Sequence, residues 1–451
     1  MTTILRHLLL SLFGLLYFLL VHQFNFFIST GIGLFLFIFF ELVDGFGKRI
    51  PIRELFSFIV FLQLFISPLI AYEYFDNNAS FEMYVSQEVY MGYVLPALIC
   101  FVIGLNLKLA SSNLRTSLSN VSFTKADENF AIGLIVVGFI STFLLEKVPG
   151  SLRFILYLMM MLKFVGVFIF LFSTNRFRWL WVLLVYGQFT IETIRGAVFY
   201  DLFVWIGFLY IFIEVKWQST FFRKLLFILI GFSVIFFIQS IKREYRDSAW
   251  EGVAAQDKEE LFLEIAANRI ESNNTLQETS DLDRFVSRLN TGWIVSKVME
   301  HTPRYEPFTE GELLQNDIKN VLLPRILFPD KDVTGGKQNQ EKFTRFTGRR
   351  LTEATTMRIG ALSDAYVNFG VIGGWVCMFC LGLFFNLTLV LLFRLASTNI
   401  QYLLWIPFIF AYAIRMSDFQ VILNYTFKAL IFVFVINYLN KSVSITKSEL
   451  S

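Results

Sequence analysis

Long apolar runs recur along almost all of this 451-residue chain, and they restrict its fold more than any other feature. A helix that crosses a bilayer needs about 20 mostly apolar residues, because backbone amides without hydrogen-bond partners are too costly in hydrocarbon. Twelve such runs are present, near residues 8–22, 24–43, 55–73, 90–107, 130–146, 153–173, 179–194, 197–215, 225–241, 364–393, 401–416 and 421–438. They predict an all-α polytopic membrane protein with about 12 transmembrane helices.

The composition excludes a water-soluble globule. Hydrophobic residues make up 55% of the chain and charged residues only 17%, against about 25% charged residues in an ordinary soluble domain. The formal net charge is only +3, so a globally basic nucleic-acid binder has no support. Cys100, Cys377 and Cys380 all lie inside apolar runs, which argues against a disulfide framework. We interpret the last two as small helix-packing residues, because a zinc site needs four convergent ligands.

Lysine and arginine collect on one side of the twelve predicted spans. On that side lie Arg6, Lys48, Arg49, Arg53, Lys108, Arg115, Lys125, Arg176, Arg178, Lys216, Arg223, Lys224, Arg394, Lys441 and Lys447. The opposite loop at 74–89 has acidic residues and no Lys or Arg. By the positive-inside rule, both termini are then cytoplasmic. The first run is followed almost at once by a second, so we expect an anchor and not a cleaved signal peptide.

The spans divide the chain into four regions. Residues 1–241 form spans 1 to 9, residues 361–440 form spans 10 to 12, and residues 441–451 form a cytoplasmic tail. The hydrophilic segment 242–360 is expected to be one large, mainly helical extracytoplasmic loop domain. Its first part is acidic and contains an expected amphipathic helix at Asp257–Glu271, with Leu261, Ile265 and Ile270 on one side.

The second part of this loop, from 318 to 364, is basic. It holds Lys319, Arg325, Lys331, Lys337, Lys342, Arg345, Arg349, Arg350 and Arg358 against five acidic residues. One interpretation is a solvated loop whose cations touch anionic headgroups. The other is a cap over the outer mouth of the bundle that grips a negatively charged ligand, since arginine forks suit phosphate oxygens.

Familiar catalytic motifs are absent from the sequence. It has no HExxH, GxxxxGK[ST] or GxSxG, so metalloprotease, NTPase and serine hydrolase have no foothold. Of the three histidines, His7 is predicted at the cytoplasmic end of the first span, which leaves His22 and His301 for an external site. Candidate site residues must therefore come from arginines and carboxylates at the outer membrane surface.

Three such groups stand out. The first is the short turn Glu192–Gly196, where Arg195 either meets a ligand or forms an ion pair with Asp201 or Glu192 that holds the hairpin. The second is Lys242–Arg246, at the outer end of the ninth span, where headgroup anchoring explains each cation equally well.

The third group opens the tenth span. Asp364 and Asn368 are four residues apart and share a helix face, so they are expected to point into one cavity. A helix cap formed by Ser363 or Asp364 is the alternative. The glycines that follow, Gly370, Gly373, Gly374 and Gly382, are expected to be close-packing positions.

Two lysines lie deep inside apolar runs, Lys163 in the sixth span and Lys428 in the twelfth. A cation at this depth normally faces an anionic partner or a wet cavity. A structural ion pair and a ligand contact both remain open for each.

Several motifs together resemble the oligosaccharide repeat-unit (O-antigen, Wzy-type) polymerases of bacterial envelopes. They are Ser287-Arg288-Leu289-Asn290, Pro307-Phe308 with Gly311, Leu323-Pro324-Arg325-Ile326-Leu327-Phe328-Pro329-Asp330-Lys331, and the stretch from Asp364 to Gly374. The Arg195-Gly196 turn and the Arg243/Arg246 pair also fall where that family carries outer-face arginines. The family often has Glu in the place of Asp364, so an acid or base at this position would have a shorter reach here.

The resemblance implies a glycosyltransferase of GT-C-like architecture in the bacterial inner membrane. Its substrates would be oligosaccharides linked through pyrophosphate to undecaprenol, its product lipopolysaccharide O-antigen, capsule or exopolysaccharide, and a chain-length regulator is a candidate partner. The lipid pyrophosphate is its own leaving group, so no nucleotide, metal or other cofactor is expected, and fixed cations would stabilise the departing charge.

Site roles follow from the same resemblance. Arg195, Arg243, Arg246, Arg325 and Lys331 are expected to hold the pyrophosphates, and Arg288 to orient the loop or a sugar. Asp364 is the first choice for general base or ligand of the acceptor hydroxyl, with His301 second. Asn368 is expected to contact a sugar. Outer aromatic residues, including Trp250, Trp293, Tyr305 and Tyr366, are candidates for stacking on sugars.

Two other classes stay open. An O-antigen ligase has the same architecture and often a His in the large outer loop, a place that His301 fills. A lipid-linked oligosaccharide flippase or other transporter also has twelve spans, but it would show an internal repeat, and we find none at matched spacing.

Overall fold

The computed structural model describes residues 3–74, 82–109, 118, 123–145, 147–250, 258–271, 285–322, 336–352 and 355–449. Its regular elements there are helices, and a single β-bridge joins Phe123 to Ser173. The helices before the large loop are α1 Thr3–Val21, α2 Phe26–Gly45, α3 Ile52–Phe61, the π-helix η1 Leu62–Ile66, α4 Ser67–Tyr74, α5 Gln87–Asn106, α6 Lys125–Leu144, α7 Gly150–Leu171, α8 Arg178–Gly196, α9 Tyr200–Trp217 and α10 Phe221–Trp250.

The large loop and the last spans complete the fold. They contribute α11 Lys258–Glu271, α13 Gly292–His301, α14 Glu312–Leu322, α15 Gly336–Thr347, α16 Ala361–Ala396, the 3₁₀-helix η3 Ile400–Trp405, α17 Ile406–Phe410, the 3₁₀-helix η4 Ala413–Arg415 and α18 Phe419–Glu449. The loop is thus mainly helical where it is described, as the sequence predicts.

The chain is an all-α, multi-pass membrane protein. Within the described residues, nine helical stretches are long and apolar enough to cross a bilayer: α1, α2, α3 to α4, α5, α6, α7, α10, α16 and α18. The three other predicted spans fall on α8, α9 and the broken segment from Ile400 to Arg415, which do not meet that standard. The count of twelve therefore stays a prediction.

Contacts between distant segments join helix ends that the predicted topology puts on the same side. On the predicted inner side, Arg53 Nη2 donates to Asn386 Oδ1 at 2.8 Å, and Gln401 donates to Asp127. On the predicted outer side, Tyr84 N donates to Ser296 Oγ at 2.6 Å. These pairings agree with an alternating up-and-down path.

Glycines bring the most closely packed helices together. A Cβ on Gly104 of α5 would collide with the backbone of Phe379, and one on Gly382 of α16 with the backbone of Phe101. On the other side of the molecule, a Cβ on Gly138 of α6 would come within 2.7 Å of Lys163 Cβ in α7. The close-packing role expected for Gly382 is confirmed, and small residues act here as they do in other membrane helix pairs.

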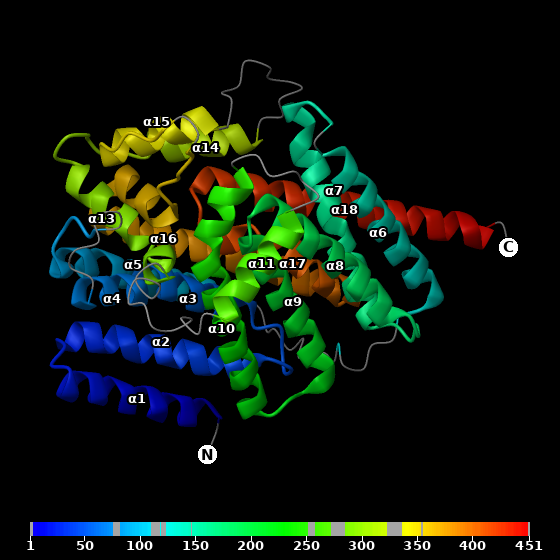
Figure 1. Ribbon diagram of the computed structural model, residues 1–451, viewed down its shortest axis with the longest axis horizontal. Helices are drawn as coiled ribbons and strands as arrows, with labels where there is room; N and C mark the ends of the chain where they lie inside the picture. Colours follow the sequence, from blue (N-terminus) through cyan, green and yellow to red (C-terminus); the bar gives the residue numbers. More distant parts are fainter. Residues whose placement is uncertain are drawn as a thin grey trace.

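Gly370 has a different role from the one predicted. Its φ of 67° and ψ of −159° are not helical, and they divide α16 into a short segment that starts at Ala361 and a long segment that ends at Ala396. Only glycine adopts this conformation without strain. Figure 1 shows α13, α14 and α15 gathered beside the start of α16, so the break separates a short piece that packs against the loop helices from the long apolar piece.

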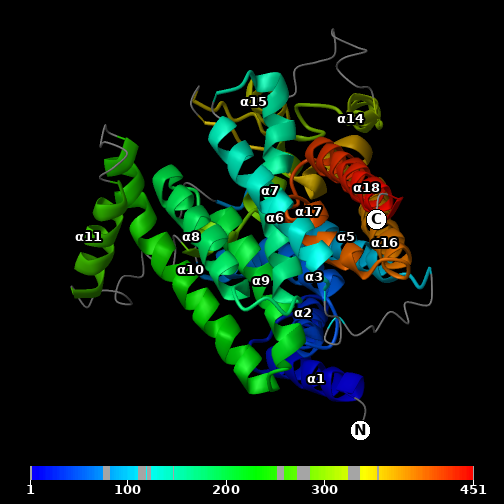
Figure 2. The same cartoon turned by 90° about the vertical axis from the view of Figure 1, so that its right-hand side faces the viewer.

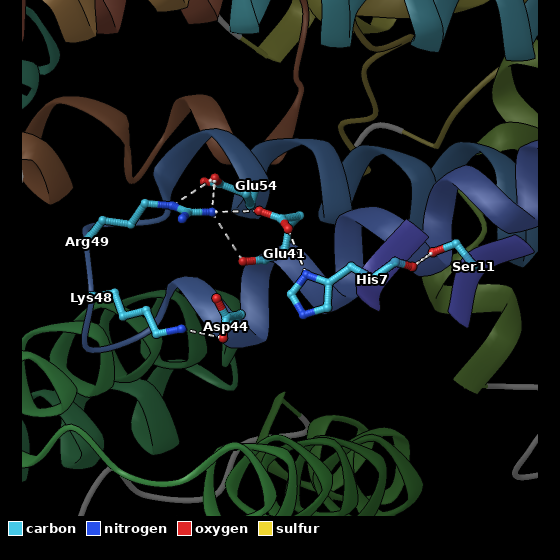
Figure 3. A network of polar contacts seen from close by, with 7 residues as sticks. All are labelled: His7, Ser11, Glu41, Asp44, Lys48, Arg49 and Glu54. Carbon is cyan, nitrogen blue, oxygen red and sulfur yellow. Dashed lines mark hydrogen bonds and ion pairs between the residues drawn. The ribbon is translucent and has the colours of Figure 1, made fainter. Parts of the chain in front are cut away.

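The N-terminal hairpin is fastened to the rest by charges at its predicted cytoplasmic end (Figure 3). His7 Nδ1 lies 2.7 Å from Glu41 Oε1, and Arg49 Nη2 bridges Glu41 of α2 at 3.1 Å and Glu54 of α3 at 2.8 Å. Lys48 pairs with Asp44 at 2.5 Å. The network holds α1 against α2 and α2 against α3.

Two smaller predictions can be compared with the fold. The amphipathic helix is α11, in which Ile265 is buried and Leu261 is packed beside it, but Ile270 is 62% exposed and does not share that packed side as predicted. The three cysteines are free thiols.

Candidate functional site

Three carboxylates from separate elements surround the ammonium group of Lys342. The ammonium group of Lys342, on α15, lies 2.6 Å from Asp364 Oδ1, 3.8 Å from Asp418 Oδ2 and 4.0 Å from Asp317 Oδ2. Asp317 comes from α14, and Asp418 directly precedes α18. We call these four residues the acid cluster. It joins helices α13 to α15 of the large loop, which we call the cap, to the start of the two long apolar helices α16 and α18.

Backbone geometry explains why the aspartates converge. Asp364 Oδ2 accepts a hydrogen bond from Phe419 N at 2.9 Å, so it caps α18 and not its own helix. Asp418 Oδ1 accepts from Gly360 N at 2.8 Å, and Ala361 N donates to Met416 O at 3.1 Å. The N-termini of α16 and α18 therefore cap one another, and their positive helix ends stabilise both carboxylates.

Burial sets the electrostatics of the acid cluster. Asp364 is 1% exposed and the Lys342 side chain 15%. Burial opposes the charge of Lys342, but the three carboxylates outweigh it and raise the pKa of its ammonium above the ordinary value. Burial also raises the pKa of Asp317 to about 6, against the ammonium of Lys342 and with the help of Asp418. The cluster is a paired charge network in which Asp317 titrates near pH 6.

The side chains of Asn368 and Tyr366 form hydrogen bonds that hold the start of α16 in place. Asn368 Nδ2 donates to Asp364 O at 2.8 Å, and its Oδ1 accepts from Thr309 Oγ1 at 3.1 Å and Leu314 N at 3.2 Å. The hydroxyl of Tyr366 donates to Thr302 O at 3.3 Å. Both side chains thus brace the start of α16 against the cap, and the carboxylate of Asp364 and the amide of Asn368 bind different partners. Asp364 and Asn368 therefore do not share the cavity that the sequence predicts for them.

His301 lies at the end of α13, on the same cap. Its imidazole stacks on the ring of Tyr305 at 5.1 Å, and Gly348 lies so close that a Cβ there would come within 2.8 Å of His301 Cε1. Half-buried, it keeps some access to solvent.

A second charged region lies near the C-terminal end of α10, on the predicted outer side. Burial lowers the pKa of Arg246, the positive charge of Arg288 lowers it further, and the neighbouring Asp247 opposes both effects. One turn before Arg246, Lys242 lies on the same face of α10. We call Lys242, Arg246 and Arg288 the basic rim. Like charges held together at a membrane surface favour an anion between them.

Arg195 is beside this rim but has an acidic partner. Tyr245, next to Arg246, donates its hydroxyl to Ile194 O at 2.7 Å, so the end of α8 packs on the end of α10. The guanidinium of Arg195 is 54% exposed and lies 2.6 Å from Glu259 Oε1 of α11. Neither ion pair considered from the sequence forms, because Glu192 lies 3.6 Å from Lys163 and Asp201 binds Arg415.

The structure does not bring all predicted site residues together. In Figure 2, α8 and α11 lie on the left, and α14, α16 and α18 lie on the right, so Arg195 and the acid cluster occupy different parts of the molecule. Arg325 and Lys331 lie outside the described residues, as does the side chain of Arg243. Of the predicted residues, Asn368 bonds the backbone of Asp364, and the charge of Arg288 acts on Arg246 elsewhere.

Lys163, the first deep lysine, has the partners that the sequence left unnamed. Its ammonium group donates to Gln188 Oε1 at 2.7 Å and Thr142 Oγ1 at 3.2 Å, and lies 3.6 Å from Glu192. It is fully buried. This is a structural ion pair of the kind considered for it.

Sequence reasoning missed three members of the acid cluster. Lys342 was counted only as one of nine basic loop residues, and Asp317 and Asp418 were not singled out. A carboxylate directly before an apolar run was available as a signal for Asp418. Among the described residues, no group of three or more His, Cys, Asp and Glu side chains is arranged for a metal ion, and in the cluster the Lys342 ammonium provides the central positive charge.

Comparison with known proteins places the chain in one family. Residues 56–448 match the family described as Domain of unknown function (DUF8712), and the chain belongs to that family. No curated protein and no solved structure matches it. The matched region includes the acid cluster and the basic rim, whereas α1 and α2 lie before it.

Proposed function

We propose that this member of the DUF8712 family is a membrane glycosyltransferase of the oligosaccharide repeat-unit polymerase type. It transfers a growing glycan from undecaprenyl pyrophosphate to the non-reducing-end hydroxyl of a lipid-linked repeat unit, at the periplasmic face of the bacterial inner membrane. The observation that supports this most is the basic rim, in which Arg246 and Arg288 meet at the predicted outer end of a long apolar helix. A lipid diphosphate presents its charge at that depth.

The proposed glycosyl transfer requires mainly that the protein hold positive charges at fixed positions. The donor carries its own leaving group, and the cations of the basic rim stabilise the negative charge that builds on the departing pyrophosphate. Arg195 adds its charge when it leaves Glu259 for the ligand. The twelve-span topology with both termini in the cytoplasm is part of the proposal, because it puts the rim and the cap on the same outer side.

The acid cluster has a supporting role in this proposal. Asp364 is buried, paired with Lys342 and bonded to Phe419 N, so it fixes the cap to α16 and α18 as a positioning residue. His301 is half-buried on the cap, and we assign to it the proton of the acceptor hydroxyl.

A genetic experiment tests the function. Deletion of the gene should leave surface glycan as single repeat units, and complementation should restore long chains. Arg246→Ala and Arg288→Ala should each lower polymer formation about 10²- to 10³-fold, the usual cost of losing one group that stabilises transition-state charge. Arg345→Ala is the matched control, since Arg345 is an exposed arginine of the cap that pairs with Glu306.

The accumulated material distinguishes the alternatives. Free undecaprenyl-linked polymer in the deletion strain would indicate a ligase, and units retained in the cytoplasm would indicate a transporter. Full-length chains from a well-expressed double variant of Arg246 and Arg288 would remove the basic rim from the mechanism.

A further inference from the structure

A partly exposed ion pair lies between aromatic rings on the predicted outer side. Arg415, at the end of η4, pairs through Nη2 with Asp201 Oδ1 in the first turn of α9. The arginine side chain is 27% exposed and the aspartate 25%. The guanidinium carbon lies 4.3 Å from the ring centre of Tyr412 and 4.8 Å from that of Tyr200. Two aromatic faces therefore hold the cation in place.

Further tyrosines extend this group. Tyr412 stacks on Tyr425 with ring centres 5.1 Å apart, and Tyr157 of α7 meets Tyr412 nearly at right angles, at 6.2 Å. We call Arg415, Asp201, Tyr157, Tyr200 and Tyr412 the tyrosine site. Helices α7 and α9 and the segment before α18 each contribute to it, so it is fixed by elements distant in sequence.

Hydrogen-bonding capacity remains unused at the tyrosine site. Arg415 Nε is buried, and no group of the described chain accepts its proton. The hydroxyls of half-buried Tyr157, Tyr200 and Tyr412 make no hydrogen bond within the described residues. Tyr425 differs, since its hydroxyl donates to Phe408 O at 2.8 Å. Buried polar groups normally find partners, so an orphaned guanidinium nitrogen beside several open hydroxyls points to a ligand.

The chemistry of the site selects the kind of ligand. Aromatic rings present flat apolar surfaces, tyrosine hydroxyls both donate and accept, a carboxylate accepts and a guanidinium donates in a fixed fork. This mixture matches a sugar ring, which has an apolar face of C–H groups and a rim of hydroxyls. A diphosphate fits poorly, because Asp201 cancels the charge of Arg415 and leaves the site neutral.

We propose that the tyrosine site binds a pyranose ring of the acceptor oligosaccharide, with Asp201, Arg415 and the tyrosine hydroxyls bonding its hydroxyls and the exposed edges of the tyrosine rings in contact with its C–H groups. The assignment of this sugar to the acceptor rests on the proposed function, whereas carbohydrate binding itself does not. The site is separate from the basic rim, so the protein holds the neutral sugar and the charged diphosphate on different residues.

Direct binding tests the inference. The probe is a set of oligosaccharide fragments released by partial acid hydrolysis from the surface polysaccharide of the source cells, titrated against the full chain in lipid nanodiscs by saturation-transfer NMR. Tyr412→Phe keeps the ring and removes one hydroxyl, so the fragments should bind about 2- to 10-fold more weakly, the loss of one hydrogen bond. Arg415→Lys should weaken binding by about 10-fold or more, because lysine lacks the planar fork.

Tyr425→Phe is the matched control. It makes the same chemical change on a buried hydroxyl that bonds Phe408 O, so it should leave fragment affinity unchanged. Inorganic pyrophosphate should not displace the fragments. Wild-type affinity in both Tyr412→Phe and Arg415→Lys, no binding to the wild type, or displacement by pyrophosphate would each overturn the proposal.

Polymer formation separates this inference from the proposed function. If the wild type extends chains and its fragments do not bind at the tyrosine site, the sugar site is wrong and the polymerase stands. If the fragments bind as expected and gene deletion leaves chain length unchanged, the sugar site stands and the polymerase is wrong.

Discussion

Replacing Lys342 by Met should release α15 from the membrane helices. Lys342 is the only cation we find among the three carboxylates of the described acid cluster. At an effective dielectric constant of about 20, its 2.6 Å pair with Asp364 is worth roughly 6 kcal/mol and its 3.8 Å pair with Asp418 roughly 4 kcal/mol before desolvation is subtracted. Removing one partner from a buried charge network costs about 3–5 kcal/mol in measured cases. We adopt that range for the variant.

Hydrogen exchange measures this loss locally. Each 1.4 kcal/mol is about a factor of ten, so the amides of α15 should exchange about 10²- to 10⁴-fold faster in Lys342→Met. Lys337→Met is the matched control, because Lys337 is an exposed lysine on the same helix. At pH 5 the difference from wild type should shrink, since carboxyls that have lost their cation take up protons more readily. Equal protection of the α15 amides in the Lys342 and Lys337 variants would refute the claim that the Lys342 ion pairs hold α15 in place.

Two further predictions concern stability. Asp317 has a pKa of about 6 in the folded protein against an ordinary 3.8, so the folded state binds its proton more tightly than the unfolded state does. The resulting contribution to stability is full below about pH 4 and is lost as the pH rises through 6, so the unfolding midpoint of the wild type in detergent should fall over this window. Asp317→Asn should flatten that slope, and an unchanged slope would contradict the assignment. Gly370→Ala should lower the free energy of unfolding by about 1–3 kcal/mol, because φ of 67° with ψ of −159° strains any side chain, whereas Gly207→Ala, with open space around its Cβ position, should be neutral or slightly stabilising in the same denaturation series.

The helices were predictable because membrane burial leaves a strong mark on sequence. A run of apolar residues about 20 long can hardly avoid being a spanning helix, and eleven of the predicted runs fall on helices that begin or end within a few residues of the expected positions. The twelfth, near 401–416, is broken into η3, α17 and η4. Its apolar composition signals burial, but composition does not say whether a buried segment is one straight helix.

Side-chain partners were predictable only where they are close in sequence. Helical spacing puts Asn368 one turn after Asp364, but Asn368 bonds the backbone O of Asp364 and does not share a cavity with its carboxylate. The partner of Arg195 was sought among its neighbours Glu192 and Asp201, yet it is Glu259, on a helix of the large loop. Pairing across such a distance depends on how whole helices pack, and one sequence carries no local signal for it.

Two short connections, from α8 to α9 and from η4 to α18, link the basic rim, the tyrosine site and the acid cluster. The turn from α8 to α9 has Arg195 at one end, beside the basic rim, and Asp201 at the other, in the tyrosine site. The joint from η4 to α18 has Arg415 in the tyrosine site and Asp418 in the acid cluster. Each connection is only a few residues long, so a shift at one group must move the next. If the two proposals hold, binding of a sugar at Arg415 is coupled both to the diphosphate position near Arg195 and to the cap held by Lys342, as a transferase of two lipid-linked substrates requires.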